Sequence, residues 1–227
     1  MKAKFILSFL ILTMSLMATA QPAFEKPDYT KIKKDIKDKK ADNYFPKLME
    51  RFTARDTTMT EENYRNLYFG FMFQEAYNPY SRSSKTDDLR KYSDLEKLDK
   101  KDLKDAIELM DKIYKEEPFN LNVMNMQAYA CQLDGNVDMA KKIAGTLGKI
   151  IDVIFSSGDG KTCETAFHVQ SISHEYLLLS ILGLEGVSQS LIKNCDYIQF
   201  EKDKYKIAGI YFDISKMQES MMAAFGK

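Results

Sequence analysis

The chain has 227 residues, of which 44% are hydrophobic and 29% charged, and its 33 basic and 33 acidic side chains give no net charge. The hydrophobic fraction supports a core in one domain of ordinary size or two small ones, and it excludes a wholly disordered chain. The absence of net positive charge argues against a general nucleic-acid binder. Three cysteines are too few for a disulfide scaffold or a structural zinc cluster.

Residues 1–20 predict a secretory signal peptide. Lys2 and Lys4 precede a largely apolar segment over 5–17, and residues 18–20 (ATA) have the small side chains of a cleavage site. The alternative is a membrane anchor, but about 13 apolar residues fall short of the roughly 20 that cross a bilayer. We expect an exported protein, periplasmic or secreted, with no stable membrane insertion after cleavage. The mature chain would carry 31 basic and 33 acidic residues, a net charge of −2.

Residues 21–155 predict a bundle of helices. Hydrophobic side chains recur at helical spacing after Asp28, after Asp42, and from Asp99 to about residue 155, with Asn120 as a further N-cap. A capping box over 58–61 predicts the start of another helix, whose aromatic stripe we interpret as core rather than as a ligand platform. Residues 77–88 are polar and contain a proline, which predicts a loop.

Small residues recur along the segment 100–148. Ala106, Ala128 and Ala140 recur along it, and Pro118 and Gly135 mark the turns. The segment resembles about one and a half units of tetratricopeptide-type helix pairing, in which small residues let paired helices approach closely. The aromatic signature of the strict repeat is missing, so an unrelated bundle of α-hairpins remains the alternative.

Residues 156–227 predict a smaller α/β part packed on the helices. The segments 165–172, 190–200 and 205–212 are strand-like, and a charged turn joins the last two into a hairpin. Residues 176–184 are helix-like, and a final helix follows Asp213 or Ser215. The predicted fold class is therefore α+β and mainly α: a tetratricopeptide-like helical bundle followed by a small antiparallel sheet with a C-terminal helix.

Five short segments together carry a family resemblance. They are the aromatic segment LYFGFMF, the NPY that follows it, SSGDGKTCETAF, NCDYIQF, and YFDISKMQESM near the C-terminus. With the export signal, this set resembles a group of secreted proteins of Gram-negative bacteria that share a domain of unknown function, number four-nine-one-nine. The resemblance implies export and a mostly helical, repeat-like body, and it implies no reaction.

Two motifs suggest chemistry but fail on their spacing. Residues 158–162 (GDGKT) look like a phosphate-binding loop, yet Phe155 stands where the earlier glycine is required. His174 begins a sequence like the helix of a zinc protease, yet Leu178 replaces the second histidine. We interpret the first motif as a plain turn, and the second leaves no zinc site of that kind.

A looser constellation remains in the same part of the chain. His168 and His174 could converge with Cys163 or Glu164 on a metal, or supply a Cys–His nucleophile. No further signature supports either site. We favour two ordinary histidines, and we predict no metal, no cofactor and no catalytic residue.

The cysteines predict one bridge in an oxidising compartment. A disulfide between Cys163 and Cys195 would close a loop of about 32 residues, with Cys131 as a buried small hydrophobe. The alternative is three free thiols.

The sequence favours a non-enzymatic binding or scaffold module that uses a helical-repeat surface for a peptide or protein partner. One alternative is an envelope or secreted hydrolase with a site near 158–174, and another is a small-ligand or lipid carrier. The candidate binding residues are polar or aromatic and lie near loops in the segments that carry the resemblance: Arg65, Tyr68, Asn78, Tyr80 and Asp159.

Overall fold

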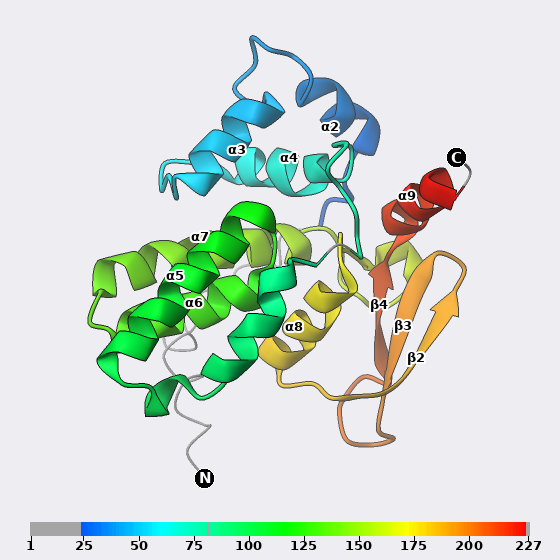
Figure 1. The fold of residues 1–227 in the computed structure, drawn as a ribbon. Coiled ribbons are helices and arrows are strands. Elements are labelled where there is room, and N and C mark those ends of the chain that lie inside the picture. The colour runs from blue at the N-terminus through cyan, green and yellow to red at the C-terminus, as the bar shows by residue number, and fades with distance from the viewer. Residues whose placement is uncertain (1–23, 81, 226–227) are drawn as a thin grey trace, which may run out of the picture.

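The computed structural model describes residues 24–80 and 82–225, so the predicted signal peptide lies outside the described residues. Figure 1 shows three parts: a layer of N-terminal helices, a second group of longer helices below it, and a small sheet beside them. None of the helices in these two ranges is long and apolar enough to cross a membrane.

The N-terminal layer consists of α2 (Tyr29–Asp35), α3 (Phe45–Thr53) and α4 (Glu61–Phe71). The carboxylate of Asp28 caps α2 as predicted, accepting from the backbone N–H of Lys31. The predicted capping box is two residues out of place, because the cap of α4 is Thr60 and its reciprocal partner is Asn63.

The second group begins with two 3₁₀ segments, η1 (Ser84–Tyr92) and η2 (Leu95–Lys97), and continues with α5 (Lys100–Glu116), α6 (Leu121–Leu133) and α7 (Val137–Phe155). Asp99, Asn120 and Asn136 cap the three α-helices with their side chains. Ala106 and Ala140 are buried, which fits close packing of neighbouring helices. The tetratricopeptide-like character of this group stays a prediction.

The C-terminal part starts with a short 3₁₀ segment, η3 (Cys163–Thr165). It then contains β1 (Phe167–His168), α8 (Ile172–Leu182), β2 (Gly186–Ile192), β3 (Cys195–Phe200), β4 (Gly209–Asp213) and α9 (Ser215–Phe225). The strand order is β1-β4-β3-β2; β2, β3 and β4 pair antiparallel, and β1 pairs parallel with β4.

Three sheet predictions need correction. The sheet is mixed rather than antiparallel, because β1 runs parallel to β4. Only two residues of the predicted strand 165–172 form a strand of the sheet, since Ser171 caps α8 and a helix starts there. The segment 190–200 is not one strand but two strands around a turn at Lys193 and Asn194, where Lys193 has a φ of 58°.

The main hydrophobic core joins both parts of the chain. A single cluster of buried side chains extends from Ile32 on α2 to Met217 on α9, and it includes residues of α7 and of all strands except β2. A smaller cluster lies between η1, η2, α5 and α6. The core therefore continues across residues 155 and 156, where the sequence predicts a boundary; that division stays a prediction.

Candidate functional site

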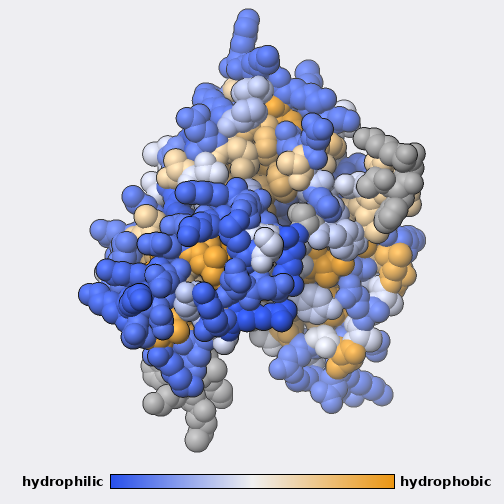
Figure 2. All heavy atoms as spheres, viewed as in Figure 1, coloured by the Kyte–Doolittle hydropathy of each residue, from blue (hydrophilic) through white to orange (hydrophobic). Residues whose placement is uncertain are grey.

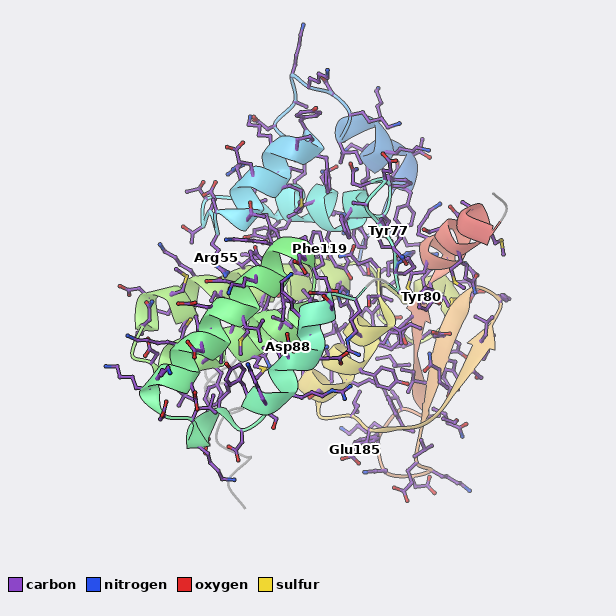
Figure 3. All side chains as sticks on the ribbon, in the orientation of Figure 1. Arg55, Tyr77, Tyr80, Asp88, Phe119 and Glu185 are labelled. Atoms are coloured by element: carbon purple, nitrogen blue, oxygen red, sulfur yellow. A yellow bond between two sulfur atoms is a disulfide. The ribbon has the colours of Figure 1, made fainter. Side chains whose placement is uncertain are left out.

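The candidate site is a cleft of about 540 Å³ where three parts of the fold meet. Its walls come from α3, from the end of α4 and the loop after it, from the α5–α6 turn, and from the start of α8. Figure 3 places Tyr77 and Phe119 along the boundary between the N-terminal layer and the helices below it. Figure 2 shows hydrophobic side chains gathered over α3 and α4 in the same view.

Four aromatic side chains form the apolar part of the cleft. Phe45, Phe71, Tyr77 and Phe119 line it. The rings contact one another: the centroids of Phe71 and Phe119 lie 4.8 Å apart, and those of Phe71 and Tyr77 lie 5.6 Å apart. Phe119 also stacks on buried Phe52 behind it, at 5.2 Å. Such aromatic pairs stabilise the wall beyond the burial of their surface.

Gln170 is the most unusual side chain of the cleft wall. It is 2% exposed, and neither the oxygen nor the nitrogen of its amide has a hydrogen-bond partner among the described residues. Its backbone is held by two tyrosines, because its N–H donates to the hydroxyl of Tyr68 and its carbonyl accepts from the hydroxyl of Tyr77. A buried unpaired amide is costly, by about 1–3 kcal/mol per unsatisfied group.

His174 also lines the cleft, but it is fully engaged by the protein. Its Nε2 lies 2.9 Å from the carbonyl oxygen of Phe119 and must donate to it, so its Nδ1 accepts from the Tyr68 hydroxyl at 2.8 Å. Burial lowers the pKa of His174 to about 4, so the ring is neutral at pH 7. With both nitrogens bonded, this histidine is unsuited to act as a general base or a metal ligand.

The polar rim of the cleft is acidic. Glu75, Glu116 and Glu117 line it together with one cationic side chain, Lys115. Hydrogen bonds from Lys85 and Ser83 hold the pKa of Glu116 below its ordinary value. Although Glu116 forms an ion pair with Lys85, the lining holds more acidic than basic side chains and favours neutral or basic ligands over acidic ones.

The predicted binding residues are dispersed. Asn78 lines the cleft, and Tyr68 lies behind it, fully buried against His174. Arg65 donates to the hydroxyl of Ser156 at the end of α7 and to the backbone carbonyl of Glu25 in the N-terminal segment. The structure does not bring Arg65 into the lining of the cleft.

Tyr80 and Asp159 also lie outside the cleft lining. Tyr80 is 57% exposed and its hydroxyl contacts the sulfur of Met221. Asp159 belongs to a turn and pairs with Lys161 at 3.1 Å. Sequence reasoning missed Gln170 and Phe119, because only packing brings these two segments together and no local pattern marks either one.

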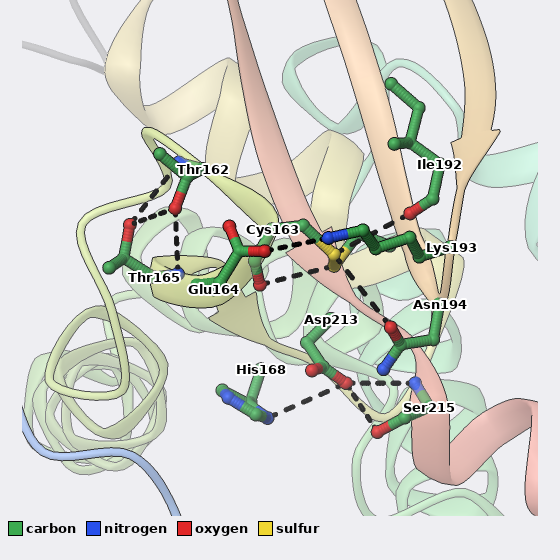
Figure 4. Close-up of a disulfide and its surroundings, with 11 residues drawn as sticks. Thr162, Cys163, Glu164, Thr165, His168, Ile192, Lys193, Asn194, Asp213 and Ser215 are labelled. Atoms are coloured by element: carbon green, nitrogen blue, oxygen red, sulfur yellow. Dashed lines mark hydrogen bonds and ion pairs between the residues drawn. A yellow bond between two sulfur atoms is a disulfide. The ribbon is translucent and has the colours of Figure 1, made fainter.

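The residues considered for catalysis have separate partners (Figure 4). Cys163 and Cys195 form a disulfide with an S–S distance of 2.01 Å, so Cys163 has no thiolate to offer. Glu164 pairs with Lys193 at 2.9 Å. His168 contacts the Tyr29 hydroxyl at 3.1 Å, and burial lowers its pKa to about 4. Among the described residues, no cluster of three His, Cys, Asp or Glu side chains could hold a metal ion.

Comparison with known proteins gives a family but no activity. The family model described as a domain of unknown function (DUF4919) matches residues 30–223. No curated protein and no solved structure matches the chain.

Proposed function

Because the chain belongs to the DUF4919 family, whose description names no activity, we propose its function from the cleft: it is a non-enzymatic binding protein that takes a short peptide segment of a partner. The observation that carries this proposal is the buried, unpaired amide of Gln170.

A carboxamide side chain offers a carbonyl acceptor and N–H donors, the same pair that a backbone peptide group presents. A bound peptide reaches these two buried atoms only when the Gln170 side chain rotates toward the cleft. In that conformation a backbone peptide group would satisfy both atoms at once and recover the cost of their burial. The two tyrosine hydroxyls that fix the backbone of Gln170 support a preorganised site, which lowers the entropic cost of binding.

The remaining lining fits side chains on either side of such a peptide group. The wall around Phe71 and Phe119 suits an apolar or aromatic side chain, and the rim around Glu75, Glu116 and Glu117 suits a neutral or basic one. We therefore propose a peptide with an apolar residue next to a basic residue.

The two alternatives have less support. A hydrolase near 158–174 lacks a nucleophile of the expected kind, because Cys163 is in a disulfide and His168 and His174 are both buried and neutral. For a lipid carrier the lining is too polar, since Glu117 and Gln170 interrupt its apolar surface.

We place this binding activity outside the cytoplasm, in the periplasm or in the secreted fraction. The apolar N-terminal segment with its cleavage sequence supports export. The disulfide between Cys163 and Cys195 supports an oxidising compartment, where such bonds persist.

The test is peptide display on the purified protein, followed by titration of synthetic versions of the enriched peptides. We expect enriched sequences that combine an apolar and a basic residue. Gln170→Met should weaken their binding about tenfold or more, because it removes the amide and keeps the side-chain volume.

The matched control is Gln132→Met, at the far end of α6 on an exposed site, which should bind like the wild type. Without peptide, Gln170→Met should melt at a higher temperature than the wild type, since it removes a buried unpaired group. Equal peptide binding by Gln170→Met and the wild type, or no enrichment of any peptide, would contradict the proposal.

A further inference from the structure

The rim of the cleft carries three carboxylates, and two of them are bound by other residues of the chain. Glu116 forms an ion pair with Lys85 and accepts from the hydroxyl of Ser83 at 2.6 Å. Glu117 is bound at both of its oxygens. One accepts from the backbone N–H of Ser83, and the other accepts from the side-chain amide of Asn120 at 2.8 Å. Both carboxylates therefore hold neighbouring segments of the chain together.

Glu75 is the third carboxylate, and its side chain is exposed at the same rim. In the ranges that the structure describes, this side chain has no hydrogen bond and no ion pair with another residue. Lys115, the cationic side chain of the lining, is not paired with it either. The charge of Glu75 is therefore available to a bound ligand, unlike the charges of Glu116 and Glu117.

The segment that carries Glu75 is fixed beside the rest of the site. The carbonyl of Gln74 accepts from the backbone N–H of Tyr77 at 3.0 Å, which closes a turn around Glu75. Tyr77 is buried, packs edge-on against Phe71 at 5.6 Å and donates through its hydroxyl to the carbonyl of Gln170. Because Glu75 stands two positions before Tyr77, its carboxylate lies on the same bank of the cleft as the aromatic wall.

We propose that Glu75 is the specificity-determining residue of the cleft, whose carboxylate pairs with a basic side chain next to the apolar residue of the bound peptide. This inference rests on the proposed function and deepens it, since it assigns the choice of charge to one residue. An unpaired carboxylate attracts a cationic side chain and repels an anionic one, so it selects in both directions. Glu116 and Glu117 shape the rim through their contacts inside the protein.

The experiment titrates one peptide, enriched by display on the purified protein, in three synthetic versions. These carry lysine, norleucine or glutamate at the basic position, and norleucine removes the ammonium group while keeping most of the side chain. We expect Glu75→Gln to lower the preference for lysine over norleucine by about two- to fivefold relative to the wild type, the range of an exposed ion pair. Glu75→Lys should prefer the glutamate version to the lysine version. This reversal shows a direct contact in a variant that is still folded.

Two glutamate variants are the controls. Glu185→Gln removes the same charge from an exposed site, and Figure 3 places Glu185 well away from the cleft residues Tyr77 and Phe119. It should bind all three versions like the wild type. Glu116→Gln should weaken the lysine and norleucine versions alike, because it removes contacts within the protein and leaves the selecting carboxylate in place.

The outcomes separate this inference from the proposed function. Equal binding by Gln170→Met and the wild type, or no enriched peptide, overturns the proposed function and this inference with it. A peptide that Gln170→Met weakens, but whose preference for lysine over norleucine is the same in Glu75→Gln and the wild type, overturns this inference alone. A loss of that preference in Glu116→Gln as large as in Glu75→Gln would also overturn it.

Discussion

The carboxyl group of Glu175 is fully buried in α8, beside Asp196 of β3. Burial and the neighbouring carboxylate raise the pKa of Glu175 to about 9 from an ordinary value of 4.5. His168 and His174 change in the other direction, since burial lowers the pKa of each to about 4 from 6.5. All three groups are thus neutral in the folded protein at pH 7.

These pKa values predict that the free energy of unfolding is highest near pH 6.5 and decreases on both sides of it. Below pH 6.5, the two histidines bind protons in the unfolded chain but stay neutral in the folded protein. The free energy of unfolding therefore decreases as pH falls from 6.5 toward 4. Above it, folded Glu175 still holds a proton that the unfolded chain has released, so stability is lost as pH rises toward 9.

The variant Glu175→Gln isolates the alkaline side of this profile. It is neutral at every pH, so near pH 8.5 it should be more stable than the wild type by more than ~1 kcal/mol. Near pH 4.5 the two proteins should agree closely. Urea unfolding at both pH values measures this, and a constant difference between the two proteins would refute it.

At the scale of elements, the turn over 158–162 depends on glycine. The backbone N–H groups of Asp159 and Gly160 both donate to the carbonyl of Thr165, at 2.8 and 2.9 Å, and these two bonds close the loop over 159–165. A Cβ atom at Gly158 would lie 2.2 Å from the carbonyl oxygen of Ala166. Backbone atoms at that distance cannot move aside cheaply.

We therefore expect Gly158→Ala to lower the free energy of unfolding by about 1–3 kcal/mol. Gly145→Ala is the matched control, because a Cβ there meets nothing within 4 Å and the residue lies in the middle of α7. Alanine at that site should stabilise the protein by about 0.5–1 kcal/mol. Thermal unfolding of both variants gives the comparison, and equal effects would show that the close approach at Gly158 is unimportant.

The helices of this chain were easier to predict from the sequence than its strands. The starts of α2, α5 and α6 were predictable, because a capping side chain and the first turn of its helix are neighbours in sequence. The sheet was predicted less well: the parallel β1 and the turn inside 190–200 depend on which strands meet in space. The cleft was not predictable, since Phe119 and Gln170 precede α6 and α8 and are brought together only by the packing of those two helices.

For the whole molecule, the disulfide and the proposed export signal lead to one prediction. The bond between Cys163 and Cys195 closes a loop with a sequence separation of 32, which is worth about 3–4 kcal/mol in the chain-entropy model. The full chain, expressed in a Gram-negative host, should be recovered from the periplasm or medium with Gln21 as its first residue. Its stability should fall by about that amount on reduction.

Two controls accompany this prediction. Cys131→Ala removes the buried free thiol and should lose as much stability on reduction as the wild type. The double variant Cys163→Ser/Cys195→Ser should lose none on reduction. An unprocessed N-terminus, recovered with the cells' cytoplasm, would contradict the export prediction.

The first and last helices of the described chain meet. The ammonium group of Lys216 on α9 lies 5.1 Å from the ring of Tyr29 on α2, and the Tyr29 hydroxyl contacts His168. A ribosome must therefore complete nearly the whole chain before α2 finds all of its native contacts. Contacts this distant in sequence slow folding, so α2 gains the last of its native contacts only after α9 has been synthesised.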